Sequence, residues 1–576
     1  MTRVFNDPAH FKDDMVDGFV AAYQHHVERV PGASGVMIRG GARPGKVSVI
    51  IGGGSGHYPA FCGLVGHGIA SGAVIGDIFT SPSDEQAYLV GSALNGGAGV
   101  LFSYGNYAGD VMNFGQAEQR LRQDGVECRT VLVTDDIASA SKGQENQRRG
   151  IAGDFCVFKS AGAAADRGDD IDEVQRLANH TNARTRSFGV AFAGCTFPGA
   201  ERPLFSVDEG RMEIGLGIHG EPGVRGGDQV QAAELAEILV EPLLAERPAA
   251  ADGRAAVLLN GLGSTKYEEL FVLWKDAQRL LTEAGVRIIE PEVGELVTSL
   301  DMSGCSLTVC WLDDELEELW TAPADTPAYR KAPAAAWQKW TPPYDKSVVT
   351  DTPGWNGTDR SAEYVSDESR EIAETVRRCL SAMLTAVEKE EQALGDLDAI
   401  AGDGDHGRGM VRGLRAAVAA AADPALGVGS ALVAAGTAWG DAGGGASGAL
   451  WSALLRAIGN HLGNRNPPTA RSVAEGVAEG QRAVTRLGNA TVGDKCLLDA
   501  LDPFVHRLDR RLEEGDKLRP AWRSAAEVGT QAANRTAELV PKVGRARPLA
   551  DKSVGTPDPG AVSLALCLEA VGRALP

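Results

Sequence analysis

An acidic run in the second half of the chain is the strongest chemical signal in the sequence. Asp398, Asp403 and Asp405 fall within eight residues, and the glycines between them allow a tight bend. Hard oxygen ligands this close together suit Mg²⁺, which keeps several waters and takes its remaining ligands from substrate phosphates. An EF-hand calcium loop is disfavoured, because its twelfth position requires Glu and counting from Asp398 places Gly409 there. The open alternative is a solvated acidic turn.

A glycine-rich loop with the sequence GGGASG follows at residues 443–448 and leads into a helical stretch at 449–458. Backbone amides at a helix N-terminus have no partner within the helix and bind a phosphate well. Further on, GRAR contains Arg545, and the rigid turn TPDPGA contains Asp558. Metal carboxylates, an amide cradle and an arginine together describe a nucleoside triphosphate site. Within the loop, the residues assigned to the phosphates are Gly444, Gly445, Ala446, Ser447 and Gly448.

Three glycine loops in the first half of the chain carry titratable side chains. GGGSGH ends in His57, GNYAGD ends in Asp110, and GLGIHGEPG holds His219 between glycines. Each loop alone is compatible with an ordinary turn, since a lone histidine in a glycine loop is more often structural than catalytic. We expect the three loops to deliver His, Asp and His from one sheet to a small polar ligand. The run GGGSGH is no nucleotide fingerprint, because GxxxxGK[ST] is absent and the spacing of GxGxxG is not met.

The elements that position these loops follow an α/β pattern. Between about residues 45 and 312, short β-branched runs alternate with longer helical patterns. Nearly every predicted strand ends in a loop rich in Gly, Asp or Asn, and ligands of α/β sheets usually bind beyond the strand ends. The predicted strands are 47–51, 100–104, 130–133, 189–192, 256–259, 287–289 and 307–311.

The second half has the pattern of an all-helical domain. Apolar residues at 372–387 follow helical spacing, and the Ala-rich blocks 413–422 and 430–438 have high helix propensity without β-branched runs. Residues 331–365 follow neither period and carry several prolines, which indicates an irregular linker. The sequence therefore predicts three parts, namely an α/β domain at 1–330, the linker at 331–365 and an all-helical domain at 366–576.

The charge balance restricts the partners. The chain has 56 Lys and Arg against 77 Asp and Glu, a net charge of −21, and such a surface repels nucleic acid and anionic lipid. The N-terminal segment has acids where a signal peptide needs an apolar core, and no run approaches the roughly 18 apolar residues of a membrane span. The nine cysteines form no CxxC pair, and we interpret them as reduced thiols. We therefore expect a cytoplasmic protein without a nucleic-acid or membrane partner.

Taken together, these motifs resemble the single-chain, ATP-dependent dihydroxyacetone kinase family over nearly the whole chain. The ketose-binding domain of that family is matched by GGGSGH, GDIFTSPS, GNYAGD, RRGIAG, GIHGEPG and TSLDMSG. Its nucleotide-binding domain is matched by GDGDHG, GGGASGALW, GDKCLLDAL, GRAR and TPDPGA. The resemblance implies an α/β first domain, a second domain that is a barrel of antiparallel helices with Mg-ATP at one end, and a homodimer.

The resemblance also assigns roles in the first domain. It implies that a ring nitrogen of His219 adds to the substrate ketone as a covalent hemiaminal, which a neutral imidazole can form at neutral pH. Asp110 would accept the proton of the attacking primary hydroxyl, and His57 would assist by hydrogen bonding to the substrate. The substrate-binding residues would be Gly54, Ser55 and Gly105, the first two through their backbones.

In the second domain, the resemblance implies that the three aspartates of the acidic run hold two Mg²⁺ ions that bridge the phosphates of ATP. His406, Ser447 and Arg545 would contact phosphate oxygens. Phosphoryl transfer then needs mainly in-line positioning and charge neutralisation, and no phosphoenzyme is required.

The sequence departs from the family pattern at four positions. The loop GNYAGD often begins with lysine, whereas Gly105 stands here, and the residue after GGGSGH, often acidic, is Tyr58. A pocket without that lysine has room for one more hydroxymethyl group, so we expect erythrulose to be used at least as well as dihydroxyacetone. Arg408 and Cys496 stand where small residues or Thr are common, which affects local nucleotide contacts but leaves the three aspartates in place.

Three other activities fit parts of the same pattern. FAD-AMP lyase (cyclising) activity would use the same metal carboxylates without needing His219. A non-catalytic ligand-binding regulator is disfavoured by the complete set of three aspartates. Phosphoryl supply from a phosphotransferase relay, with ADP held as a cofactor, is disfavoured because the two domains are fused and no carrier domain is added.

Overall fold

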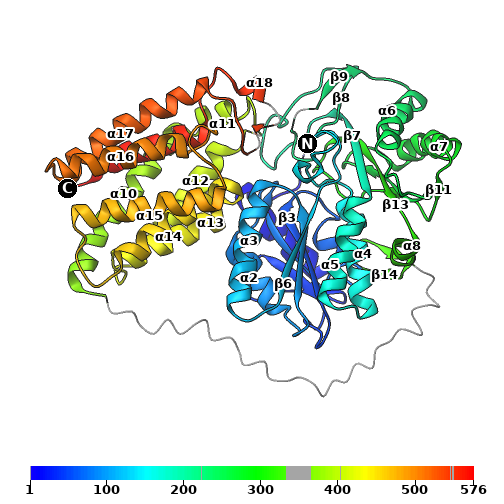
Figure 1. Cartoon of the computed structure of the whole chain (residues 1–576), viewed down its shortest axis with the longest axis horizontal. Coiled ribbons are helices and arrows are strands. Elements are labelled where there is room, and N and C mark those ends of the chain that lie inside the picture. The colour runs from blue at the N-terminus through cyan, green and yellow to red at the C-terminus, as the bar shows by residue number, and fades with distance from the viewer. Residues whose placement is uncertain (1, 222, 332–364, 403, 545, 548–549) are drawn as a thin grey trace.

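A computed structural model of the chain describes residues 2–221, 223–331, 365–402, 404–544, 546–547 and 550–576. The first half contains two β-sheets with helices on their faces, whereas the described residues of the second half contain helices without strands (Figure 1). Of the predicted linker at 331–365, only the two end residues are described, and Asp403 and Arg545 also lie outside the described residues. No helix in the described ranges is both long enough and apolar enough to span a membrane.

The first sheet lies between two pairs of helices. Its elements are β1 (Val27–Arg29), β2 (Gly35–Ile38), β3 (Ser48–Ser55), β4 (Gly72–Ile78), β5 (Val100–Gly105), β6 (Cys128–Val133), α2 (Asp84–Ala93), α3 (Ala108–Gln123), α4 (Asp154–Arg167) and α5 (Ile171–Ala183), with α1 (Phe11–Ala22) beside them. The strand order is β1-β2-β4-β3-β5-β6, with parallel pairing from β4 to β6 and antiparallel pairing of β2 with both neighbours. Helices α2 and α3 cover one face and α4 and α5 the other (Figure 1), so the strands are apolar on both sides.

The second sheet is mainly antiparallel. Its elements are β7 (Thr185–Ala193), β8 (Arg211–Ile214), β9 (Arg225–Asp228), β10 (Arg254–Gly261), β11 (Arg287–Ile288), β12 (Glu292–Gly294), β13 (Ser303–Trp311), α6 (Ala232–Ala245) and α7 (Tyr267–Glu283), followed by α8 (Asp314–Thr321), β14 (Ala324–Asp325) and β15 (Arg330–Lys331). The strand order is β11-β10-β13-β7-β8-β9, and β12 also pairs with β10. Helices α6 and α7 pack on this sheet through a separate apolar cluster.

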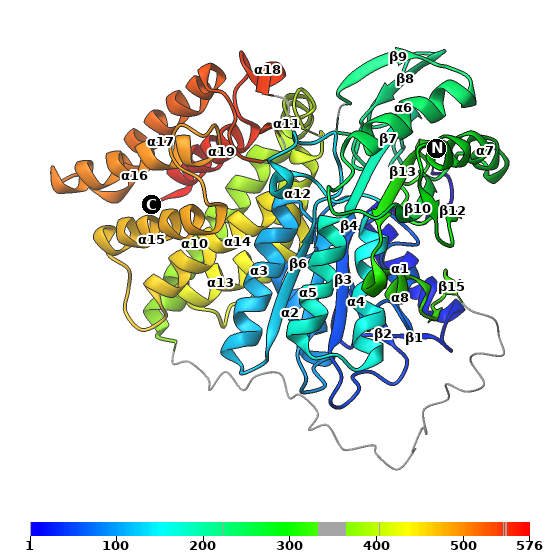
Figure 2. The same cartoon turned by 45° about the vertical axis from the view of Figure 1, so that its right-hand side comes forward.

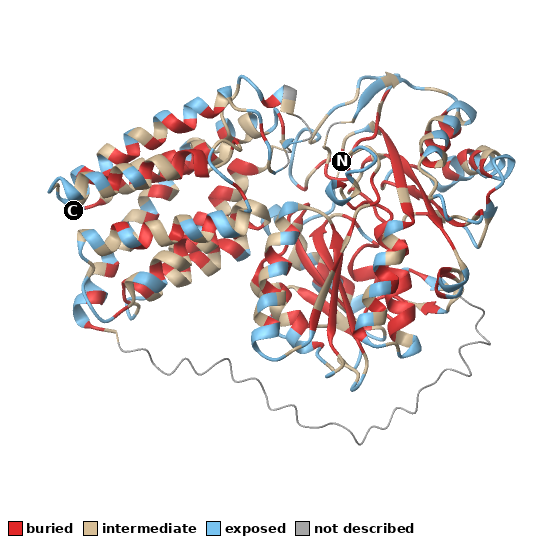
Figure 3. Cartoon of the chain, in the orientation of Figure 1, coloured by how far each residue is buried: buried red, intermediate tan, exposed pale blue. Residues whose placement is uncertain are grey.

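The helices of the second half form a closed ring. They are α10 (Asp367–Lys389), α11 (Glu391–Asp398), α12 (His406–Ala420), α13 (Val428–Gly443), α14 (Gly445–Leu462), α15 (Ala470–Gly488), α16 (Leu498–Glu513), α17 (Leu518–Arg535), α18 (Ala550–Ser553) and α19 (Pro559–Ala574). Contacts run in the order α10-α12-α13-α14-α15-α16-α17-α19, and α19 returns to α10. Their buried faces meet inside the ring (Figure 3), where Trp439 stacks on Trp451.

The two halves of the chain are in contact. Helix α14 packs against α3, and α13 packs against α2 (Figure 2). Among the described residues, two ion pairs cross this seam, one between Arg412 and Asp77 and one between Arg456 and Asp84, with an N–O distance of 3.2 Å in the second. Asp77 lies at the end of β4 and Asp84 begins α2. The helical domain is therefore docked at the strand ends where ligands were expected.

The predicted strands all coincide with observed strands, but one expectation about them is wrong. His57 and Asp110 follow β3 and β5 of the first sheet, whereas His219 follows β8 of the second sheet. The three loops therefore converge from two sheets. Strands β8 (RMEI) and β9 (RGGD) form the hairpin that brings His219 to the site. Both are too short and too polar for the sequence pattern to predict them as strands.

Candidate active site

The two predicted histidines face each other. His57 Nε2 lies 3.1 Å from His219 Nε2, and both side chains are buried. His57 Nδ1 lies 2.7 Å from the carbonyl oxygen of Thr298, an acceptor, so Nδ1 carries the proton and donates it. Burial, and secondly the charge of His219, lower the pKa of His57 to about 3. His57 is therefore neutral at neutral pH.

Aromatic rings fix the orientation of this histidine pair. Phe79, which follows β4, stacks on His57 with 4.9 Å between ring centroids and meets His219 edge-on at 5.4 Å. Tyr107 also meets His219 edge-on, at 4.5 Å, and its phenol donates to the carbonyl of Gly150 at 2.9 Å. Rings packed in this way exclude water and leave the imidazoles little rotational freedom.

Asp110 lies in the first turn of α3, directly beside the glycine loop at 443–448, which we call the cradle. A Cβ atom added to Gly109 would lie 3.0 Å from the amide nitrogen of Ala446 and 3.1 Å from the carbonyl carbon of Gly445. The Gly445 N–H donates to the carbonyl of Ser81 at 3.3 Å, which holds the cradle against the first domain. The predicted base and the predicted phosphate site are thus neighbours.

The predicted substrate-binding residues have different surroundings. A Cβ atom on Gly54 would lie 2.5 Å from the amide nitrogen of Thr80, so this glycine allows β3 to approach the turn after β4. Ser55 is buried, and its Oγ has no hydrogen-bond partner among the described residues, which leaves it available to a ligand. A Cβ atom on Gly105 would lie 3.0 Å from the ring of Tyr107. The Tyr107 ring therefore occupies the space in which a side chain at position 105 would begin.

Three carboxylates gather at one end of the helical ring. Asp398 ends α11, Asp405 precedes α12, and Asp558 caps α19, where its Oδ2 accepts from the N–H of Ala561 at 2.7 Å. Burial, followed by the charge of Asp398, raises the pKa of Asp405. Burial also raises the pKa of Asp558 to about 7, and Asp398 adds to that shift. Mutually repelling hard oxygen donors of this kind fit Mg²⁺.

His406 links the cradle helix to the end of the ring. Its Nε2 lies 2.9 Å from Ser563 Oγ on α19, and its Nδ1 lies 3.4 Å from Ser447 Oγ on α14. Burial lowers the pKa of His406 to about 4, so the ring is neutral. Gly444 and Gly445 adopt φ angles of 61° and 60°, a region that favours glycine. Ala446 and Gly448, with Ser447, form the first turn of α14 as expected.

Sequence reasoning missed several residues at the seam between the halves. The Arg408 guanidinium lies 4.7 Å from the centroid of Phe197, whose ring lies 5.6 Å from that of Phe79. Arg408 thereby connects the helical ring to the aromatic rings around the histidine pair, although the sequence shows it only as a departure from the family pattern. Arg412, one turn further along α12, pairs with Asp77. Asp77 lies within the motif GDIFTSPS and Arg412 lies a few residues after GDGDHG, but no local sequence pattern predicts that these two side chains form an ion pair.

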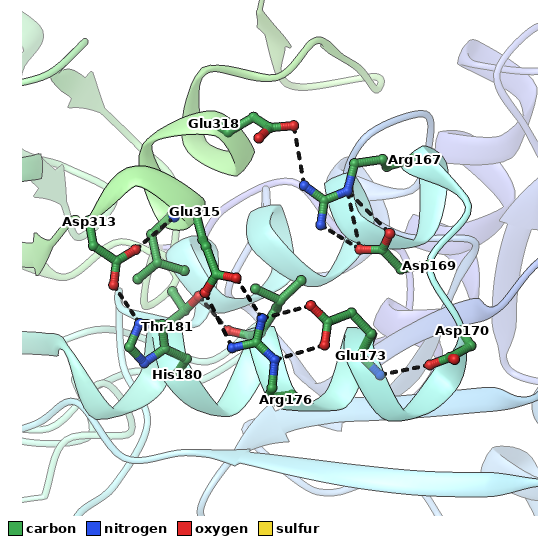
Figure 4. A network of polar contacts seen from close by, with 12 residues as sticks. Arg167, Asp169, Asp170, Glu173, Arg176, His180, Thr181, Asp313, Glu315 and Glu318 are labelled. Atoms are coloured by element: carbon green, nitrogen blue, oxygen red, sulfur yellow. Dashed lines mark hydrogen bonds and ion pairs between the residues drawn. The ribbon is translucent and has the colours of Figure 1, made fainter.

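Among the described residues, the only three metal-type side chains whose ligand atoms all lie within 4.8 Å of one another are on the surface, away from Asp398 and Asp405. Ligand atoms of His180, Asp313 and Glu315 lie within 4.8 Å of one another. Figure 4 shows that these side chains belong to a network of ion pairs, in which Arg176 bridges Glu173 and Glu315. Asp313 Oδ2 lies 2.6 Å from His180 Nε2. The network ties α5 to α8 and shares no residue with the predicted site.

Comparisons with known proteins follow the same division of the chain. The Dak1 domain matches residues 17–328, and the DAK2 domain matches residues 400–573. The chain is 55% identical to a D-erythrulose kinase of Mycolicibacterium smegmatis, covering 99% of this chain and 98% of the relative. It is 48% identical to an L-erythrulose kinase of Pectobacterium atrosepticum, covering 100% and 97%. The crystal structure of the dihydroxyacetone kinase from C. freundii in complex with AMP-PNP and Mg²⁺ is 30% identical, with a TM-score of 0.53 and full coverage of both chains.

A kinase is the class of protein that these full-length comparisons define. The chain belongs to the dihydroxyacetone kinase (DAK) family, in the form that carries both domains on one chain. The predictions of the family, of an α/β first domain followed by an all-helical second domain, and of kinase activity are confirmed.

Proposed function

We propose that the protein transfers the γ-phosphate of ATP to a primary hydroxyl of erythrulose, a four-carbon ketose. The contact of Gly109 with the Gly445–Ala446 peptide carries this proposal, because it sets the first turn of α3, which carries Asp110, against the cradle that would hold phosphates. Phosphoryl transfer depends mainly on holding the acceptor hydroxyl and the phosphate in line. A base and a phosphate cradle from two domains meet that requirement at this seam.

In the first domain, Nε2 of His219 would add to the ketone carbon and hold the ketose as a hemiaminal. The surroundings support this role, since His219 is buried, oriented by Phe79 and Tyr107, and its Nε2 faces His57. His57 would hydrogen-bond to the substrate, and Asp110 would take the proton of the attacking hydroxyl. Gly54, Ser55 and Gly105 would line the ketose.

In the second domain, Asp398, Asp403 and Asp405 would hold two Mg²⁺ ions, which supply charge neutralisation at the phosphate oxygens. The raised pKa of Asp405 beside Asp398 supports this assignment, because crowded carboxylates favour a cation. The C. freundii dihydroxyacetone kinase was crystallised with AMP-PNP and Mg²⁺. The nucleotide-binding residues would be His406, Gly444, Gly445, Ala446, Ser447, Gly448, Arg545 and Asp558.

Two observations support a tetrulose over the triose. The two relatives described above are both named for erythrulose, and the higher identity, 55% against 48%, favours the D enantiomer. Position 105 offers no side chain to a substrate oxygen, and the Tyr107 ring packs in its place. A triose would thereby lose one polar contact, whereas the additional CHOH group of a tetrulose brings contacts of its own.

A substrate panel with ATP and Mg²⁺ tests the proposal. We expect D-erythrulose to give the highest kcat/KM among dihydroxyacetone, the two erythruloses, glyceraldehyde and glycerol. His219→Ala should abolish phosphorylation of ketoses and would spare a cyclising FAD-AMP lyase reaction. Efficient use of dihydroxyacetone with poor use of both erythruloses would contradict the tetrulose assignment, and phosphorylation of none of these would contradict the kinase reaction.

The same family relationship supports a domain division at 1–330 and 366–576 and a homodimer in the cytoplasm, without a nucleic-acid or membrane partner. All nine cysteines are free, as a reducing compartment requires. Size-exclusion chromatography with light scattering should give twice the chain mass of 60.3 kDa. A monomeric mass at micromolar concentration would contradict the dimer.

A further inference from the structure

The buried contacts of His219 determine where its ring protons lie. Glu221 Oε1 lies 3.3 Å from His219 Nδ1, and Glu221 Oε2 accepts the backbone N–H of His219 at 3.0 Å. An ionised carboxylate accepts hydrogen bonds and donates none, so Nδ1 of His219 carries a proton. On the other side, Nδ1 of His57 carries its proton toward Thr298, as described above.

Both Nε2 atoms of the histidine pair therefore point at each other with their remaining lone pairs. At 3.1 Å, two neutral rings in these tautomers would set one lone pair against another. A single proton shared between the Nε2 atoms removes this conflict. The contact with Glu221 favours this proton on His219, because the carboxylate lies 3.3 Å from that ring and burial lowers the pKa of His57.

The charges behind His219 alternate in sign. Arg149 Nη1 lies 3.7 Å from Glu221 Oε1, and Arg149 Nε and Nη2 donate to Asp136 Oδ2 at 3.0 and 2.8 Å. The side chains of Arg149 and Glu221 are each 12% exposed, so they act at low dielectric. Tyr107, which packs edge-on against His219, stays neutral because burial raises its pKa well above the usual value.

We propose that Glu221 is the counter-ion that keeps His219 cationic both before and after the ketose is tethered. Arg149, fixed by Asp136, holds the Glu221 carboxylate in place. This inference rests on the hemiaminal of the proposed function and adds a positioning residue to it.

The tethering step balances without any proton from solvent. His57 Nε2 takes the Nε2 proton of His219, and the freed lone pair attacks the ketone carbon to form the C–N bond. The C=O π pair moves to oxygen, which takes the proton from His57 and becomes the hemiaminal hydroxyl. The ring of His219 ends as an N-alkylated imidazolium that keeps its Nδ1 proton, so its charge is +1 at the start and at the end.

Proton counting on Glu221→Gln tests this assignment. The variant keeps an acceptor for Nδ1 but loses the negative charge, so His219 should be neutral in the free protein and the cationic adduct must take up a proton. Titration calorimetry in buffers of different ionisation heats measures the protons taken up when the ketose binds. At pH 7 we expect about zero protons per ketose for wild type and about one for the variant. The apparent Kd of the variant for the ketose should then rise about tenfold per pH unit, with ATP affinity unchanged.

Controls separate this inference from the proposed function. Glu201→Gln, at an exposed position, should behave as wild type, and Glu221→Asp should restore proton-neutral binding. A bound ketose labelled with ¹³C at the ketone should show a tetrahedral carbon by NMR in wild type, and its absence would refute the hemiaminal itself. If that signal is present and Glu221→Gln binds the ketose without proton uptake, the counter-ion role is refuted and the tether stands.

A direct measurement on wild type covers the case of a variant that does not fold. ¹⁵N NMR of histidine-labelled protein, with the His219 signals assigned by their loss in His219→Ala, reports the protonation of each ring nitrogen. The proposal requires both nitrogens of His219 to be protonated in the free protein at pH 7. A single protonated nitrogen would overturn it.

Discussion

Gly109→Ala should separate binding from phosphoryl transfer. The added Cβ would lie 3.0 Å from the Ala446 nitrogen and 3.1 Å from the carbonyl carbon of Gly445, whereas ordinary contacts of this kind lie at about 3.5–4.0 Å. The cradle and the start of α3 must therefore separate by about 0.5 Å. A misplacement of about 1 Å can cost on the order of 10²-fold in rate, so half of it should lower kcat about tenfold.

The assay compares kcat with the Kd of each ligand. The ketose and ATP bind in different domains, so both Kd values should stay near those of wild type while kcat falls. Gly115→Ala is the matched control, because it lies on the same helix with no atom within 4 Å of the added Cβ. Wild-type kcat in Gly109→Ala, or a kcat loss of equal size in Gly115→Ala, would refute the reasoning that this contact aligns the two sites.

The remaining predictions concern the ketose tether, the metal site, substrate size and pH. His219→Ala should lose the covalent density joining the ring to a tetrahedral carbon in ketose-soaked crystals and keep ATP binding by calorimetry; a ketone bound in planar form in wild type would contradict the tether. Asp405→Asn should weaken Mg-ATP binding and turnover together, and normal Mg²⁺ dependence would reduce the acidic run to a solvated turn. Gly105→Lys should displace the Tyr107 ring and shift preference toward dihydroxyacetone by roughly 2- to 13-fold in kcat/KM, the worth of one hydrogen bond of about 0.5–1.5 kcal/mol; an unchanged ratio would contradict this. Burial raises the folded-state pKa of Asp558 to about 7, so the free energy of unfolding of the metal-free protein should fall as pH rises from about 4 to 7. Asp558→Asn can still cap α19 and should make this fall smaller in denaturant titrations.

The sequence located the strands and the reactive loops because their signals are local. Short runs of apolar, β-branched and aromatic residues marked β3 and β5, and glycine-containing motifs marked the chain that follows these runs. The first three glycines of GGGSGH, however, lie within β3 rather than beyond it, and Gly54 is required by the approach of Thr80. A string of glycines indicates that the backbone packs closely against a neighbour, but it does not show whether this neighbour is a ligand or another segment of the chain.

The partners of the reactive groups could not be predicted for the same reason. Thr298, which fixes the tautomer of His57, is 241 residues away from it in the chain. Arg412 and its partner Asp77 are 335 residues apart. Periodicity and motif spacing extend over one or two turns of an element, so contacts of this range appear only once the two sheets and the helical ring are assembled.

The closed ring of helices has a consequence for protein synthesis. The ring is completed only when α19 packs between α10 and α17; Asp558 caps this helix, and Ser563, the partner of His406, lies on it. While residues 559–574 are still inside the ribosome, the nascent chain can form the α/β domain but lacks one wall of the helical barrel. A chain synthesised only as far as α17 can therefore have its α/β domain folded while the helical ring is still open.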